Sequence, residues 1–250
     1  MAETQQQQIR ELRALNLTPK QIARKLGIKV SEVNAAIQNE AEQTALDRLE
    51  KGELEPVYQC LASENLLQLL LKNSPENSIK NLLTKIIPAK NNKEIERGLG
   101  LVVISRVARY NQITVCSYLL DVWCLGVKDA TPPRTLDRRE FKDFVEVLFE
   151  PFPEKPQEIG LEVAAGMIFS ACEYAESLGF QPHKDFEKAR SHIGNWDGKI
   201  RIECGRNGKP CFVSGPYDNS KKIIETLNKS RGEGNFDFIV GSAPGGRDFW

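Results

Sequence analysis

Three uncharged polar residues near the start of the sequence have side chains that can recognise bases. Ser31, Asn34 and Gln38 follow one another at intervals of three and four residues, the spacing of neighbours on one helix face. The carboxamides of Asn and Gln each pair with adenine through two hydrogen bonds, and a Ser hydroxyl donates or accepts one. On one face of a helix, these side chains would be of the types that pair with nucleic-acid bases.

Basic residues border this group and match the charge of a phosphate backbone. Those expected to contact phosphates are Lys20, Arg24, Lys25 and Lys29. Residues 9–39 carry six Lys or Arg and two Glu, a net charge of +4, whereas residues 40–55 carry a net charge of −4. The full chain balances 34 basic against 34 acidic side chains, which excludes a uniformly basic coat but leaves room for a local patch.

Two short helices and a tight turn are needed to hold these side chains. Thr18 is a favourable N-cap, Pro19 suits the first turn, and Gln21 completes a capping box. Gly27 then ends the first helix at a turn that requires a positive φ. The positions predicted to face inward from both helices are Ile22, Ala23, Leu26, Ile28, Val33 and Ile37. A short helix from Ile9 to Leu15 is predicted to precede them.

The stretch from Leu17 to Ile37 resembles the bacterial helix-turn-helix superfamily. The resemblance implies that DNA is the partner and that the second helix presents Ser31, Asn34 and Gln38 to it. Two features depart from the common pattern: Lys29 occupies a position that often holds Ser or Thr, and the exposed face lacks Arg, the usual reader of guanine. The alternative is a three-helix unit that contacts protein.

A second group of residues has the chemistry for hydrolysis. Asp121 lies near the end of an apolar segment, His183 and Asp185 lie in QPHKDF, and Asp129 follows the loop LGVK. A carboxylate beside a histidine can act as a general base or support metal-assisted hydrolysis. The same residues also fit structural roles, with Asp121 holding backbone amides at a strand end and His183 near a helix start. A hydrolase that uses Asp121, His183 and Asp185 is therefore the second hypothesis.

Other motifs for phosphate, metal or cofactor binding are weak. The loop of residues 214–216 precedes a helix with Lys221 and Lys222 and could bind phosphate through helix N-terminal amides. Asp218 would repel that anion and is a better N-cap. The six cysteines form no C-x-x-C pair, and those in apolar stretches are expected to pack in the core. We therefore predict neither a metal nor a cofactor.

The larger part of the chain, residues 57–240, is predicted to be an α+β domain. Two β-hairpins are expected, one from residues 101–107 and 113–123 and one from residues 199–204 and 211–214, the latter around an Asn-Gly turn. A final strand is expected at residues 235–240. Helices are predicted at residues 66–71, 79–87, 136–149, 159–178, 183–193 and 221–227.

This domain resembles a group of uncharacterised bacterial proteins with no assigned activity. The resemblance rests on SYLLDVWCLGVKDA, AAGMIFSACEYAESLGFQPHKDFEKAR and GRNGKPCFVSGPYDN. Some members of the group end in a cysteine-rich zinc segment that this sequence lacks, which agrees with the prediction of no metal.

The remaining segments complete the predicted organisation. Residues 1–8 are expected to be disordered, residues 9–40 to form the helix-turn-helix unit, and residues 41–56 to be a charged linker or a helical extension. Residues 241–250 form a flexible tail with Phe249 and Trp250, which could dock on a partner.

The sequence shows no secretory signal and no apolar run long enough for a membrane span, which favours the cytoplasm. The leading hypothesis is a DNA-binding, regulatory protein whose larger domain binds a partner or self-associates. The alternatives are the hydrolase and a protein interaction module.

Overall fold

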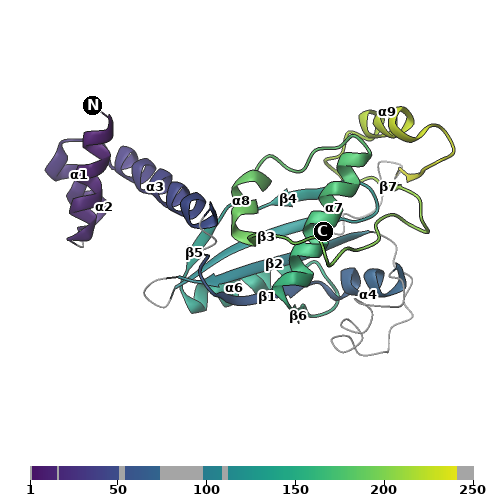
Figure 1. Cartoon of the computed structure of the whole chain (residues 1–250), viewed down its shortest axis with the longest axis horizontal. Helices are drawn as coiled ribbons and strands as arrows, with labels where there is room; N and C mark the ends of the chain where they lie inside the picture. The colour runs from purple at the N-terminus through teal and green to yellow at the C-terminus, as the bar shows by residue number, and fades with distance from the viewer. Residues whose placement is uncertain (1, 16, 51–53, 74–97, 109–111, 241–250) are drawn as a thin grey trace. The chain divides into compact units, whose positions relative to one another are not determined.

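The computed structural model describes residues 2–15, 17–50, 54–73, 98–108 and 112–240 of the chain. The chain divides into two compact units, Met1–Leu54 and Glu55–Trp250 (Figure 1). The first unit is helical, and the second combines an antiparallel sheet with helices. The fold is therefore α+β, as the sequence predicted.

The described residues of the N-terminal unit form three helices: α1 (Ala2–Ala14), α2 (Pro19–Leu26) and α3 (Val30–Glu50). The predicted capping box begins α2, because the Thr18 N–H donates to Gln21 Oε1 over 2.8 Å and the Gln21 N–H donates to Thr18 Oγ1 over 3.4 Å. Gly27 ends this helix with a φ of 68°. The three helices pack around the side chains of Ile9, Leu12, Leu17, Ile22, Ala23, Leu26, Ile28, Val33, Ala36 and Ile37.

One boundary in this unit differs from the prediction, and a second was left open between two alternatives. Residues 2–8, expected to be disordered, belong to α1, and Ile9 is buried and anchors that helix in the core. Glutamine has a good helix propensity, so a run of it extends a helix whose apolar side is already packed. Residues 41–56 were expected to be either a charged linker or a helical extension, and residues 41–50 continue α3. No Gly or Pro interrupts the sequence there.

An antiparallel sheet forms the centre of the larger unit (Figure 1). Its strands in the described residues are β1 (Val57–Ala62), β2 (Leu99–Val107), β3 (Ile113–Asp121), β4 (Gly126–Ala130), β5 (Arg134–Leu136) and β6 (Gln157–Ile159). Their order is β4-β3-β2-β1-β6, and β5 pairs with the first residues of β3, beyond the part that pairs with β4. The predicted first hairpin is confirmed, since β2 and β3 pair in continuous register.

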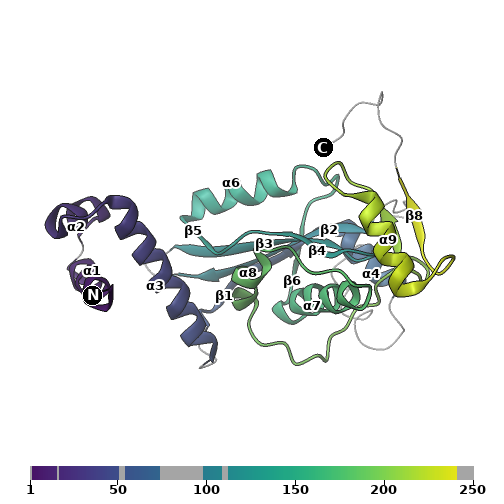
Figure 2. The ribbon, with the colours of Figure 1, turned by 90° about the horizontal axis from the view of Figure 1, so that it is seen from above.

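Both faces of this sheet are covered, which explains why its central strands are almost continuously apolar. Along β2, Leu101 and Val103 pack on one face, and Val102 and Ile104 pack on the other. The helices that contribute to these two layers are α4 (Glu64–Asn73), α6 (Arg138–Phe149), α7 (Leu161–Ser177) and α8 (Phe186–Ile193). Figure 2 shows α6 on one side of the sheet and α7 and α8 on the opposite side.

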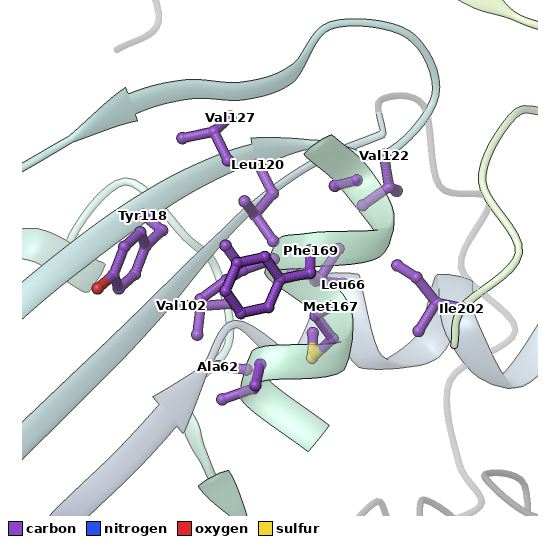
Figure 3. Packing of buried hydrophobic residues seen from close by; sticks show 14 of the residues in the cluster. Ala62, Leu66, Val102, Tyr118, Leu120, Val122, Val127, Met167, Phe169 and Ile202 are labelled. Atoms are coloured by element: carbon purple, nitrogen blue, oxygen red, sulfur yellow. The ribbon is translucent and has the colours of Figure 1, made fainter. Parts of the chain in front are cut away.

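Small residues allow α7 to approach its neighbours closely. A Cβ atom at Gly126 of β4 would lie 2.6 Å from the Cβ of Ala175, and one at Gly166 would lie 2.6 Å from Ile200 Cγ2. Figure 3 shows the resulting core, in which side chains of α7 gather with those of the central strands and α4.

The last part of the chain adds one helix and two short strands: α9 (Ser220–Arg231), β7 (Cys211–Val213) and β8 (Asp237–Ile239). The two strands pair in parallel. They enclose a separate cluster with α9 that includes Phe212, Leu227 and Phe236. This cluster also contains Leu178 from the residues after α7, so the C-terminal part is anchored on the larger core.

The second predicted hairpin is wrong. The Asn207-Gly208 turn does form, with a positive φ at both residues, and a single bridge closes it. Residues 199–204 are not a strand, because separate contacts hold their backbone, such as the hydrogen bond from the Ile202 N–H to Ser170 Oγ over 3.2 Å. β7 pairs with β8 instead.

Four strands were not predicted. β1 lies just before the apolar segment predicted to be a helix at residues 66–71, and β4, β5 and β6 are too short for their periodicity to stand out. The helix predicted at residues 79–87 and the tail at residues 241–250 lie outside the described residues.

Candidate nucleic-acid interface

The three residues predicted to read bases lie together on the solvent side of α3. Ser31, Asn34 and Gln38 are all exposed, and they form one stripe that spans two helical turns. On the opposite side, Val33 is completely buried and Ile37 is half-buried in the core of the N-terminal unit. The stripe is therefore available for contact, while its helix is fixed by packing from behind.

The side chains of this stripe are free of other partners. In the described part of the chain, the side chains of Ser31, Asn34 and Gln38 take part in no hydrogen bond or ion pair. Their neighbour Glu32 is engaged, because its Oε2 accepts the Lys29 N–H over 3.1 Å at the start of α3. The stripe thus offers uncharged donors and acceptors, and the adjacent carboxylate is held at the turn.

The four residues predicted to contact phosphates are also exposed. Lys20, Arg24 and Lys25 come from α2, and Lys29 comes from the turn between α2 and α3. No carboxylate of the described residues forms an ion pair with any of them. Arg10 is different, since its Nε lies 2.6 Å from Glu40 Oε1 and links α1 to α3. Uncompensated positive charge therefore lies on α2 and the turn, in addition to the exposed Arg13 of α1.

The residues of the hydrolase hypothesis fall into two groups. His183 Nδ1 lies 3.4 Å from Asp129 Oδ1 and 3.8 Å from Asp185 Oδ2, so these three side chains meet. The His183 carbonyl accepts the Phe186 N–H at the start of α8, which supports the structural role considered for His183. Among the described residues, no hydrogen bond or ion pair joins this group to Asp121.

Asp121 holds the turn between β3 and β4. Its Oδ1 accepts the N–H groups of Trp123 and Cys124 over 3.0 and 3.2 Å, the structural role that the sequence analysis considered. Burial raises the pKa of this carboxyl from 3.8 to about 6, although Lys128 acts in the opposite direction. The raised pKa of Asp121 therefore follows from its burial in this turn and does not by itself indicate catalysis.

A small cavity of about 30 Å³ adjoins Asp121, and its other lining residues are Gly98, Leu99, Lys128, Val213, Ser214 and Gly215. Such a volume holds little more than a water molecule. Asp218 Oδ2 accepts from Lys128 Nζ over 2.7 Å and from the Gly215 N–H over 2.8 Å. The Asp218 carboxylate is thus already bound to the backbone N–H and the lysine that a phosphate would need. Asn219, rather than the predicted Asp218, is the N-cap of α9.

The cysteines are free thiols, and five of the six are buried. Burial raises the pKa of Cys60 to about 11 and that of Cys172 to about 12, which keeps both thiols protonated at neutral pH. In the described ranges, no three His, Cys, Asp or Glu side chains are grouped to hold a metal ion.

Two buried polar residues were missed by the sequence analysis. Arg106 in β2 is 4% exposed, and its guanidinium donates to the carbonyls of Glu55, His192 and Ile193. His192 is 7% exposed, its Nε2 has no hydrogen-bond partner among the described residues, and burial together with the charge of Arg106 lowers its pKa from 6.5 to about 4. The sequence feature that could have identified Arg106 as a buried residue is its position inside the apolar run LVVISRV, where a charged side chain is unusual.

Comparison with known proteins gives no relative: no family model matches the chain, and neither a curated protein nor a solved structure is significantly similar to it. Within the described residues, no helix is both long enough and apolar enough to cross a bilayer.

Proposed function

We propose that this chain is a cytoplasmic, bacterial, regulatory protein that binds duplex DNA through its N-terminal unit. In this proposal, α2 and α3 form a helix-turn-helix. The stripe of Ser31, Asn34 and Gln38 faces the major groove, which is wide enough to admit a helix. The basic residues of α2 and the turn contact phosphates, and the larger unit binds a protein partner or a second copy of the chain.

The observation that supports this proposal is the combination of the exposed stripe of Ser31, Asn34 and Gln38 on α3 with the basic residues of α2 and the turn, none of which has a side-chain partner in the described part of the chain. A helix that contacts protein usually presents an apolar or aromatic core to its partner. Among the exposed positions of α3 from Val30 to Gln38, Val30 carries the one large apolar side chain, and the others are polar or small. Charge complementarity therefore favours a polyanion over a protein as the partner of this face.

A hydrolase is less well supported. General base catalysis requires hydrogen-bond reach between the acting groups. Asp121 is engaged by backbone amides of its own turn, and the described residues contain no hydrogen bond or ion pair between Asp121 and His183.

The proposal is tested by binding of the full chain to a fluorescent duplex at low salt, measured by anisotropy. We expect a dissociation constant on the order of 1–100 µM for an arbitrary sequence at physiological salt, and tighter binding at low salt. The double substitution Arg24→Glu with Lys25→Glu should weaken this binding strongly, because it places two carboxylates opposite phosphates.

A matched control is available on α9, where Lys221 and Lys222 form another exposed basic pair. The substitutions Lys221→Glu with Lys222→Glu change the total charge equally and should leave binding nearly unchanged. If this control abolishes binding while the α2 variant retains it, the DNA contact belongs to the larger unit and the proposal is wrong. Absence of binding by the intact chain at low salt would also refute it.

A further inference from the structure

We infer that the exposed stripe of α3 selects A·T base pairs, with Asn34 and Gln38 as the residues that determine this specificity. The inference rests on the proposed binding of duplex DNA and concerns which bases the same surface recognises. It follows from the side chains present on the stripe, from their spacing and from their freedom from other partners.

The first argument is the chemistry of the stripe. In the major groove, Asn and Gln pair with the N6 and N7 atoms of adenine, while guanine is read through two hydrogen bonds from Arg or Lys. No Arg or Lys occurs in α3 between Val30 and Asp47. Ala35 is exposed beside Asn34, and its methyl group suits contact with the methyl group of thymine. The stripe therefore matches both members of an A·T pair and lacks a reader of guanine.

The second argument is spacing. Asn34 and Gln38 are separated by four residues, which is about 6 Å along a helix axis. Base pairs follow one another at about 3.4 Å, so the two carboxamides are about two base-pair steps apart. Ser31 lies one turn before Asn34 and extends the contact at the N-terminal end of α3. The expected target therefore contains two A·T pairs separated by about two steps.

The third argument is that these two carboxamides have no structural task. Elsewhere the fold uses such groups in helix caps: Gln21 Oε1 accepts the Thr18 N–H, and Asn219 Oδ1 accepts the Lys222 N–H. Asn34 and Gln38 are exposed and take part in no such bond among the described residues. Pairing with a base therefore requires no intramolecular hydrogen bond to break.

The test begins with selection of duplexes from a pool with a randomised centre, using the full chain. We expect enrichment of two A·T pairs about two steps apart. A selected adenine is then replaced by 7-deazaadenine, which lacks the N7 acceptor. This replacement should weaken binding by the unmodified protein and should have little effect on the variant that lacks the matching carboxamide.

The variants are Asn34→Ala and Gln38→Ala, each expected to lose discrimination at one of the two positions by about 5- to 150-fold. The matched control is Asn39→Ala, because Asn39 is exposed and of the same residue type but lies about 100° around the helix from Gln38. This control should keep the full preference.

The outcomes separate the inference from the proposed function. If the chain binds the pool without enriching A·T pairs, or if Asn34→Ala and Gln38→Ala keep the original preference, the inference is wrong and DNA binding stands. An equal loss of discrimination in Asn39→Ala also overturns it. If the chain binds no duplex at low salt, the proposed function itself fails.

Discussion

Acidification should reveal two buried groups in the larger unit whose effects on stability oppose each other. The pKa of His192 is lowered from 6.5 to about 4, so its contribution to stability is complete above pH 6.5 and is lost as the pH falls through 4. The pKa of Asp121 is raised from 3.8 to about 6, so its contribution is complete below pH 3.8 and is lost as the pH rises through 6.

The two contributions nearly cancel between about pH 7 and about pH 4.5. Over that interval the unfolded chain binds a proton at His192 that the native state resists, which costs about 2 kcal/mol of unfolding free energy. Over the same interval, the native state binds a proton at Asp121 more readily than the unfolded chain does. This raises the unfolding free energy by about 2 kcal/mol. Both side chains are less than a tenth exposed, so solvent screening changes these values little.

Single substitutions should remove this cancellation. His192→Gln is expected to gain about 2 kcal/mol of stability on acidification, because only the Asp121 effect remains. Asp121→Asn is expected to lose about 2 kcal/mol over the same interval, because only the His192 effect remains, while its amide oxygen can still accept from the turn. The double variant should again resemble the unmodified protein.

The assay is urea unfolding at the two pH values, followed by tryptophan fluorescence, since Trp123 and Trp196 both lie in the larger unit. Each variant is compared with itself at the other pH, so a general loss of stability does not affect the result. If His192→Gln shows the same pH dependence as the unmodified protein, His192 is not held neutral by burial and the reasoning is refuted.

Two further predictions concern packing and capping. Gly166→Ala should destabilise the larger unit by about 1–3 kcal/mol in urea unfolding, because the new methyl group would lie 2.6 Å from Ile200, whereas Gly160→Ala at an open position should cost less. Equal effects would contradict the packing described for α7. Thr18→Ala should destabilise the N-terminal unit by about 0.5–2 kcal/mol in thermal unfolding followed by circular dichroism, and Thr18→Ser should restore most of the loss. No difference between the Ala and Ser variants would show that the cap contributes little.

The sequence was most informative where local rules decide the structure. The capping box at Thr18 and the turn at Gly27 depend on residues within a few positions, and both form as predicted. The hairpin of β2 and β3 was predictable because two apolar segments follow each other closely in the chain. The exposure of Asn34 and Gln38 followed from the buried positions of the same helix.

Predictions failed where distant segments compete for the same backbone groups. The Asn207-Gly208 turn forms, but the residues before it bond to Ser170 and neighbouring segments instead of completing a hairpin. Whether Asp121 joins the His183 group depends on tertiary contacts that no local pattern reveals. The Oδ1 atom of Asp121 instead accepts from the N–H groups of its own turn. The buried contact of Arg106 with the end of α8 joins residues more than eighty positions apart, which no local pattern reveals.

The central claim is that the basic residues of α2 and the turn contact DNA phosphates, and the salt dependence of binding tests it most directly. The slope of log K against log salt changes by about 0.9 for each phosphate contact. For the full chain and an arbitrary duplex, Arg24→Ala with Lys25→Ala should therefore make the slope less steep by about 1.8, while Lys221→Ala with Lys222→Ala should leave it unchanged. An unchanged slope in the α2 variant, or a loss confined to the α9 variant, would contradict the account.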